Sequence, residues 1–274
     1  MKTLPIQPTR IQTLNKQSIK KGPYVLYWMQ QSQRAEYNHA LKYAIQQANT
    51  LGKSVLVGFG LMDDYPEANL RHLTFMLEGL QETQATLATQ GIKMVIQRGS
   101  PVDVALALGK DAALIVCDRG YLRHQKAWRT HVALSADCPV VQVESDVVVP
   151  IALVSNKAEY AARTIRPKIH RHLDNCIVPF WPSKVKKNSL GLKIHSLDLK
   201  NIGNPLNRLA LDQQVAPVTQ FFKGGPSQAI AKFEDFIQNK FHRYVENRNQ
   251  PQTNDISHMS PYLHFGQISP LYLA

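Results

Sequence analysis

The sequence predicts an α/β fold: a doubly wound, parallel five-stranded sheet with helices on both faces, followed by a long linker and the truncated start of an all-α domain. Three observations lead there. Five short apolar runs rich in β-branched residues recur between residues 23 and 150, and amphipathic helical patterns separate them. After Pro150, proline and glycine become frequent and the periodicity is lost until about residue 223.

Each apolar run is long enough for one strand and apolar on both faces, as expected for buried parallel strands. In chain order the runs are Tyr24–Met29, Ser54–Phe59, Ile92–Gln97, Ala113–Cys117 and Pro139–Glu144. Between the second and third runs, Leu73, Met76, Leu77 and Leu80 follow the i, i+3, i+4, i+7 spacing of a helix. This alternation predicts a sheet with helices on both faces.

Four segments are expected along the chain. Residues 1–22 are predicted to be a flexible basic arm, and residues 23–150 the α/β domain. Residues 151–222 are predicted to hold a basic helix, at about 155–171, and an interdomain linker. Residues 223–274 are predicted to begin a helical domain that is incomplete, with Ser227 capping its first helix.

Composition excludes several classes of protein. No apolar run approaches 18 residues and no apolar signal segment is present, so no membrane association is expected and the predicted location is cytoplasmic. Three cysteines without Cys-x-x-Cys spacing give no disulfide framework and no metal site. The net charge of +12 is concentrated in residues 1–35 and 157–200. It favours a polyanion such as nucleic acid, although basic segments can also serve solubility alone.

Two Ser-Pro pairs near the end of the chain are the strongest local signal. Ser260-Pro261 and Ser269-Pro270 each place a cap and a first helical residue, which predicts two closely spaced helix N-termini. Such termini suit a phosphate or pyrophosphate because their first backbone N–H groups are unpaired. By contrast, Gly58 and Gly60 lack a third glycine, so a Rossmann fingerprint is not supported.

Five separated stretches, in order and over nearly the whole chain, resemble class II cyclobutane pyrimidine dimer photolyases of the cryptochrome/photolyase superfamily. They are YWMQQSQRAEYNHAL (27–41), FMLEGL (75–80), SNKAEYAARTIRPKI (155–169), YVENRNQP (244–251) and ISHMSPYLHFGQIS (256–269). In that family an α/β domain, which in some members holds an antenna chromophore, is joined by a long linker to a helical domain that binds FAD.

The resemblance implies a light-driven carbon–carbon lyase that repairs pyrimidine dimers in double-stranded DNA. Reduced FAD donates an electron to a dimer flipped out of the duplex, and the opened product returns it, with no net redox change. A second, antenna chromophore of deazaflavin or folate type is possible in the family, and the sequence does not choose between these types or none. A monomer is expected for the full-length protein.

The resemblance also implies site residues. Tyr244 matches the family tyrosine that contacts FAD, and the stretch matching the segment that holds the flavin phosphates is Ile256, Ser257, His258, Met259 and Ser260. The family usually reads Leu-Ser-Asn-Leu-Ser there, so His258 replaces an amide but can still donate a hydrogen bond. Arg248 and Asn249 match a pair near the lesion, and Gln250 stands where the family commonly has Asp.

Each assignment has an alternative. Tyr244 can be a packing residue and the serines mere caps; Trp28, Trp128, Trp181 and His264 are interpreted as packing residues. The family's contacts to the flavin ring and its acidic residue facing the lesion belong beyond Ala274, so no catalytic residue is expected within this chain. The chain alone is expected to bind FAD weakly and to repair nothing. Two other functions remain open: a cryptochrome-like flavin photoreceptor, and a stand-alone α/β nucleotide-binding module.

Overall fold

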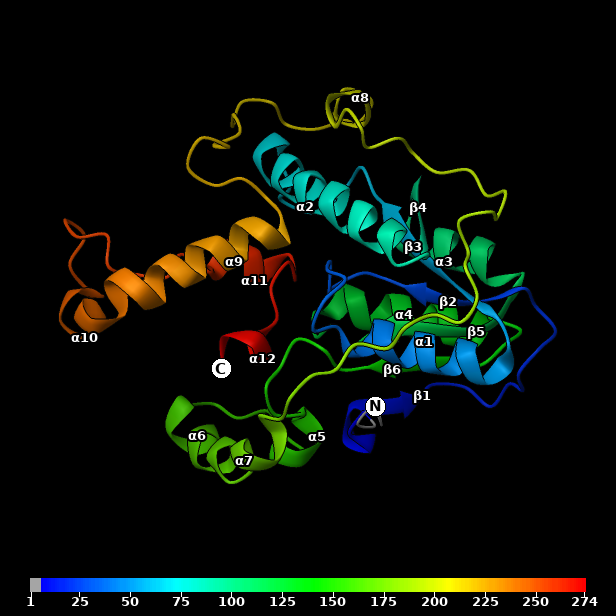
Figure 1. Cartoon of the computed structure of the whole chain (residues 1–274), viewed down its shortest axis with the longest axis horizontal. Coiled ribbons are helices and arrows are strands. Elements are labelled where there is room, and N and C mark those ends of the chain that lie inside the picture. Colours follow the sequence, from blue (N-terminus) through cyan, green and yellow to red (C-terminus); the bar gives the residue numbers. More distant parts are fainter. Residues whose placement is uncertain (1–5) are drawn as a thin grey trace.

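A six-stranded, mostly parallel sheet forms the centre of the molecule (Figure 1). The computed structural model describes residues 6–274. The sheet order is β1-β6-β5-β2-β3-β4. The parallel strands are β2 (Tyr24–Trp28), β3 (Ser54–Leu61), β4 (Lys93–Arg98), β5 (Ala112–Asp118) and β6 (Val140–Val143). They confirm the five predicted strands, with ends shifted by at most two residues.

Helices cover both faces, as predicted. The helices are α1 (His39–Leu51), α2 (Leu70–Thr89), α3 (Pro101–Gly109) and α4 (Arg123–Ser135). α1 and α2 bury residues such as Leu41 and Leu77 against one face, while α3 and α4 bury Val104 and Val132 against the other. Asn38, Asn69 and Ser100 accept backbone N–H groups at the starts of the first three helices, which fixes where each begins.

The predicted count of five strands is wrong, because the expected arm contributes a sixth. β1 (Ile11–Thr13) pairs antiparallel with β6, and Ile11 lies opposite Val143. Just before it, in a 3-10 turn (Pro8–Arg10), the buried Arg10 donates to the carbonyl oxygens of Val147 at 3.0 Å and Val148 at 2.6 Å. Residues 6–22 therefore do not form a flexible arm; residues 1–5 lie outside the described part of the chain.

Three short helices follow the sheet and form a separate lobe, here called the α5–α7 lobe (residues 151–176). They are α5 (Ile151–Val154), α6 (Ala162–His170) and α7 (Leu173–Cys176). The basic helix predicted at about 155–171 is thus shorter and starts at Ala162. Glu144 fixes the start of the lobe by accepting the N–H of Ile151 at 3.1 Å.

The connection after α7 is irregular, as expected, but it is bound to the sheet. Ser189 Oγ accepts the N–H of Lys93 at 2.7 Å, and Ser196 Oγ accepts that of Ile96 at 3.0 Å. Leu197 N–H in turn donates to the carbonyl of Ile96 at 2.7 Å. The connection therefore runs along β4, the edge strand, before reaching α8 (Gly203–Leu206).

A long helical arm and two short helices complete the chain (Figure 1). The arm runs through α9 (Pro226–Asp235), a π-helical turn (Phe236–Lys240), a 3-10 turn (Phe241–Arg243) and α10 (Tyr244–Asn247). α11 (Ser260–His264) and α12 (Pro270–Leu273) then return toward the sheet. Ser227 does not cap α9; it donates to Glu82 of α2 instead, which ties the arm to the α/β part. Within residues 6–274 no helix is long and apolar enough to cross a membrane.

Candidate functional site

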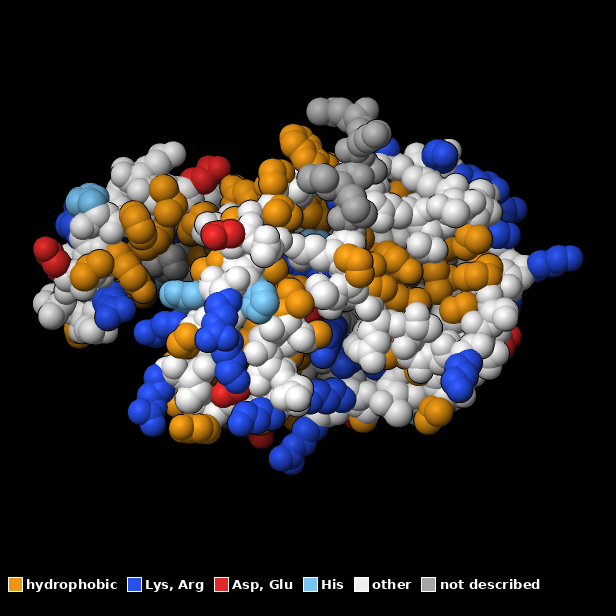
Figure 2. Space-filling model, turned by 90° about the horizontal axis from the view of Figure 1, so that it is seen from below, with side chains coloured by type: hydrophobic (Ala, Val, Ile, Leu, Met, Phe, Trp, Pro, Cys, Tyr) orange, Lys and Arg blue, Asp and Glu red, His pale blue; other side chains and the backbone are white. Residues whose placement is uncertain are grey.

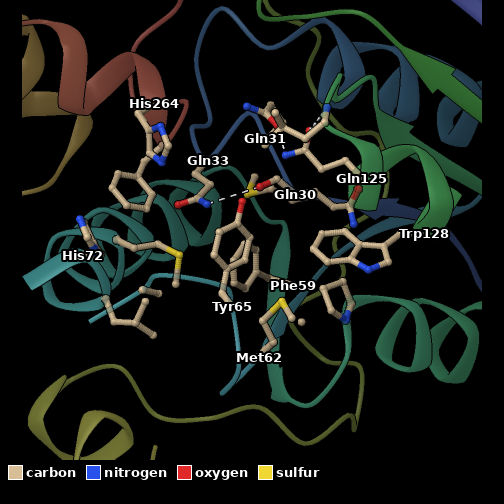
Figure 3. Close-up of a pocket in the computed structure, with 18 of the residues that line it drawn as sticks. Gln30, Gln31, Gln33, Phe59, Met62, Tyr65, His72, Gln125, Trp128 and His264 are labelled. Atoms are coloured by element: carbon tan, nitrogen blue, oxygen red, sulfur yellow. Dashed lines mark hydrogen bonds between the residues drawn. The ribbon is translucent and has the colours of Figure 1, made fainter. Parts of the chain in front are cut away.

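A cavity of about 550 Å³ opens at the carboxyl ends of β2, β3 and β5 (Figure 3). β2 is the first parallel strand and lies between β3 and β5, so the strand order reverses beside it. Ligands of open α/β sheets bind at this reversal point. Its walls are mainly apolar and aromatic: Met29, Phe59, Met62, Tyr65, Leu73, Met76 and Trp128. A volume of this size suits one drug-sized ligand.

The polar groups of the cavity come from the loop after β2 and from α4. Gln30, Gln31 and Gln33 lie on one side, and Gln125 reaches Gln31 with a hydrogen bond of 2.7 Å. Two of these amides are incompletely satisfied: within residues 6–274, Nε2 of Gln30 and Oε1 of Gln33 are buried without a hydrogen-bond partner. One free donor and one free acceptor in a buried site indicate a polar ligand edge that would meet them.

A buried carboxylate holds this loop in place. Asp118, at the end of β5, accepts the backbone N–H groups of Gln30, Gln31 and Ser32 at 2.9, 2.8 and 3.1 Å. It also accepts the hydroxyl of Tyr27 at 2.8 Å. Burial, aided by the nearby Asp146 carboxylate, raises the pKa of Asp118, and the three N–H bonds oppose that rise. The N–H groups that a doubly wound sheet offers to a ligand phosphate after its first strand are therefore already paired with a protein carboxylate.

Two aromatic rings that line the cavity, those of Tyr65 and Trp128, are connected through His124. The Tyr65 hydroxyl lies 3.1 Å from His124 Nε2, and the His124 ring lies 4.8 Å from that of Trp128. Trp28 is fully buried, as its predicted packing role requires. For Trp128 that interpretation is incomplete because the ring also lines the cavity, and for Trp181 it is wrong because the residue is 47% exposed.

One wall of the cavity belongs to the C-terminal part of the chain. Leu263, His264 and Phe265 line it, so the prediction that His264 is a packing residue is wrong; it is exposed at the cavity. Gly266 follows in the left-handed conformation, with φ of 63°. Its carbonyl accepts Arg34 NH1 at 2.8 Å, and its Cα packs on the backbone of Gln31 and Ser32.

The same Arg34 also binds Asp146 at 2.7 Å, and its side chain is 2% exposed. Next to it, Gln267 accepts the N–H of Gly225 at 2.7 Å and donates to the carbonyl of Phe75 at 3.2 Å. These buried polar contacts join the loop after β2, α2 and α9 to the C-terminal segment. α11 is therefore held against the cavity by directional bonds, which fix its position more tightly than apolar packing alone.

The residues predicted to contact a flavin lie outside this cavity, on the helical arm and just before α11. The Tyr244 ring packs edge-on against Phe236, with centroids 5.6 Å apart. Met259 is buried beside Phe75, Ile256 is 38% exposed, and Ser257 is half-buried. His258 has φ of 55° and a ring nitrogen 2.5 Å from Asn254 Oδ1.

Ser260 does not cap a helix, because α11 begins at Ser260 itself and its cap residue is Met259. Ser269 is confirmed as a cap: its Oγ accepts the N–H of Leu271 at 3.2 Å. Both predicted helix starts exist, but they belong to helices of five and four residues. The structure thus corrects the capping role of the first serine and supports that of the second.

Asp255 brings the arm and the segment 256–260 together. It accepts Arg243 through both carboxylate oxygens, at 3.0 and 2.9 Å, and Asn247 at 2.5 Å. The bonds from Arg243, followed by that from Asn247, lower the pKa of Asp255 to about 2. These contacts of Asp255 with Arg243 and Asn247 are here called the Asp255 clamp. The sequence analysis did not predict the clamp, although Asp255 stands directly before the segment 256–260 in the sequence. Arg248 and Asn249 are exposed in the turn beyond α10 and do not reach the cavity.

Comparison with known proteins places this geometry in a family. The DNA photolyase family model matches residues 25–185. The deoxyribodipyrimidine photo-lyase of Methanothermobacter thermautotrophicus is 44% identical over 98% of this chain and 59% of its own length. That of Potorous tridactylus is 32% identical over 89% of this chain and 46% of its own length. The chain therefore spans about half the length of these curated relatives.

Two solved structures share the fold. A bacterial class III photolyase from Agrobacterium tumefaciens superposes with a TM-score of 0.69 at 20% identity, covering 93% of this chain and 53% of its own. An archaeal photolyase from Sulfolobus tokodaii, crystallised with two FAD molecules that imply a novel light-harvesting cofactor, gives a TM-score of 0.67 at 16% identity, with 91% and 53% covered. Since the family model spans more than half of its residues and a similar fold recurs in these structures, the chain belongs to the DNA photolyase family.

Proposed function

We propose that the protein is a class II deoxyribodipyrimidine photo-lyase, which repairs pyrimidine dimers in double-stranded DNA with light. The five motif stretches support the class, and the names of the curated relatives support the reaction. Because the chain spans 59% of the length of the Methanothermobacter relative, the proposal concerns the protein that contains this chain.

In this proposal the cavity takes an antenna chromophore with a planar ring. Its size suits one ring system with a short substituent. The rings of Tyr65 and Trp128 offer apolar faces to such a ligand. The free donor of Gln30 and the free acceptor of Gln33 complement a ring edge with adjacent C=O and N–H groups, as flavins, deazaflavins and pterins carry.

The flavin segment would hold FAD through its phosphates. In the described part of the chain, the hydroxyls of Tyr244, Ser257 and Ser260 have no hydrogen-bond partner, so they remain available as donors. Hydroxyl and backbone donors suit phosphate oxygens. At the position of the usual amide, His258 would add a ring N–H by exchanging Asn254 Oδ1, its partner in the structure, for a phosphate oxygen. Bound in its reduced form, FAD supplies the electron for repair, and these residues hold and orient it.

Arg248 and Asn249 would meet the lesion-bearing DNA. Both side chains are exposed in the turn beyond α10, where a polyanion could approach them. The clamp at Asp255 would fix the distance between this turn and the segment 256–260.

One observation carries the proposal: α11, which directly follows the flavin segment, also forms a wall of the cavity. The two chromophore sites would thus share one helix, held by Arg34 and Gln267. A fixed spacing between two ring systems is what a light-harvesting pair needs, whereas an isolated nucleotide module has no use for it.

The decisive experiment uses protein purified from its native host. Its absorption spectrum should show a flavin and a second chromophore, and blue light should restore a dimer-containing oligonucleotide in its presence. A preparation with flavin but without repair would favour the cryptochrome-like photoreceptor and refute the proposal. A tightly held nucleotide without flavin would favour the stand-alone module; the pairing of Asp118 with the three loop N–H groups argues against that function.

A further inference from the structure

The α5–α7 lobe carries an exposed, strongly basic face (Figure 2). Between residues 151 and 178 the chain has five Lys or Arg and two acids. Arg163, Arg166 and His170 are all exposed and lie at i, i+3 and i+7 on α6, and Arg171 follows at its end. In the view of Figure 2, which looks at the side where the lobe lies, Lys and Arg side chains gather over it.

No carboxylate neutralises this face. Among residues 6–274, the guanidinium groups of Arg163, Arg166 and Arg171 have neither an ion pair nor a hydrogen bond. Of the two acids in the lobe, Glu159 is turned inward and accepts Ser155 at 2.7 Å and Lys168 at 2.5 Å. The other, Asp174, is exposed three residues after Arg171 and, within residues 6–274, forms no ion pair. The lobe thus uses one of its two acids internally and leaves three cations without an ion pair.

This arrangement weakens the helix that carries it, because like charges three or four positions apart repel on a helix surface. A solvated surface could gain solubility from the same charges placed at random or paired with acids. Along one face, Arg163 and His170 are separated by about 10 Å at 1.5 Å per residue. That length corresponds to about three steps between successive phosphates of one DNA strand, which follow each other every 3.4 Å along the axis.

The lobe is rigidly placed and lies on the side of the C-terminal helices. Gln7 binds the carbonyl of Asn175 at 2.7 Å, and Glu144 binds the first turn of α5. Tyr37 packs between Phe180, just beyond the lobe, and Tyr272 of α12, at 5.3 and 5.1 Å between ring centroids. Tyr160, 81% exposed before α6, adds an aromatic ring next to the cations. Exposed aromatic and basic side chains together are typical of nucleic-acid surfaces.

We infer that the exposed face of α6, together with Arg171 at its C-terminal end, is a DNA-backbone contact, in which Arg163, Arg166 and Arg171 each bind a phosphate. The choice of DNA as the polyanion rests on the proposed function. The contact is independent of base sequence and of the lesion, because guanidinium groups that meet phosphates carry no sequence information. It would hold the duplex at the lobe, apart from the lesion contacts proposed for Arg248 and Asn249.

The test is fluorescence anisotropy of an undamaged, labelled 25-base-pair duplex, titrated with the full chain in the dark without flavin, at salt concentrations between about 25 and 200 mM. The variant R163Q/R166Q/R171Q removes three charges from the lobe. The matched control K184Q/K186Q/K187Q removes three exposed charges from the connection near Asn49. Circular dichroism checks that both variants keep their helices.

For the arginine variant we expect at least about tenfold weaker binding at 100 mM salt, and a slope of log K against log salt that is smaller by about 2.7, at 0.9 per phosphate. The lysine control should change this slope by less than about one third of the change expected for the arginine variant. Equal losses in the two variants, or no binding by the parent chain at the lowest salt, would overturn the inference. If the native protein repairs DNA but the arginine variant binds the duplex as well as the lysine control does, only this inference is wrong. If the arginine variant binds more weakly than the control but the native protein contains no flavin and repairs no dimers, only the proposed function is wrong.

Discussion

Gly266→Ala should detach α11 from the cavity, whereas Gly52→Ala should not. Both glycines have nearly the same left-handed backbone, with φ of 63° and 66°. A Cβ costs about 1–2 kcal/mol in that conformation at either position. At Gly52 the added methyl meets nothing within 4 Å. At Gly266 it would overlap the carbonyl oxygen of Gln31 and lie 2.8 Å from the carbonyl carbon and 2.9 Å from Ser32 Cα.

The backbone atoms of Gln31 and Ser32 cannot rotate away from the added methyl group. Asp118 also holds their loop in place, because it accepts the N–H groups of both residues. The substituted segment must therefore move instead, which breaks the bond from Arg34 to the Gly266 carbonyl. A hydrogen bond to a charged group is worth about 1.5–3 kcal/mol. We expect Gly266→Ala to lower the free energy of unfolding by about 3–5 kcal/mol, against about 1–2 for Gly52→Ala.

Urea unfolding followed by tryptophan fluorescence gives both values. Limited proteolysis should show faster cleavage between residues 224 and 260 only in Gly266→Ala. Equal losses of stability in the two variants would refute the reasoning, because the left-handed backbone would then account for the whole effect.

Three further predictions follow from the same contacts. Asp118→Ala removes the carboxylate acceptor of four donors, of which only the Tyr27 hydroxyl has another, distant acceptor in the Ser32 carbonyl. At about 1–3 kcal/mol for each of the three backbone N–H groups, it should cost at least about 3 kcal/mol of unfolding free energy, whereas Asp118→Asn should cost much less; equal urea midpoints for the two variants would contradict this. Trp128→Ala should weaken binding of riboflavin, used as a ring probe, by about tenfold, as expected for a stacking contact of about 1.4 kcal/mol, and Trp181→Ala, outside the cavity, should not. The pKa of Asp255 is lowered to about 2. Its ion pair with Arg243 therefore stabilises the clamp above the ordinary carboxyl pKa, and this contribution is lost as the pH falls toward 2. Pepsin should cleave residues 248–257 increasingly fast, relative to Asp255→Asn, as the pH is lowered from 5 to 2; a constant ratio would contradict the clamp.

The strands were predictable because their signal is local. Residues such as Val25 and Leu26 face opposite sides of the sheet, yet both are buried, so an uninterrupted apolar run marks each parallel strand. β1 was not predicted because the strand has only three residues, Ile11, Gln12 and Thr13, and they are half-buried or exposed. Its strand conformation comes from pairing with β6, which the local sequence does not encode.

The cavity was not predictable from any motif because its parts are far apart in the sequence. Trp128, Gln30 and His264 meet only after the sheet, α4 and α11 have assembled. One signal was available: the polar run Gln30–Gln33 follows directly after the first parallel strand, where ligands of such sheets gather. The flavin segment shows the opposite case, since its family motif is local, but the role of Asp255 depends on Arg243 twelve residues earlier.

The connection that runs along β4 has a consequence for solubility. An open edge strand is a template on which another copy of the chain can add a strand, and such addition leads to aggregation. Here the short β1, of three residues, forms one border of the sheet, and Ser189, Ser196 and Leu197 occupy backbone groups of the other. The connection after α7 therefore occupies part of the β4 edge, and a shortened connection is expected to expose backbone groups on which a second copy could add a strand.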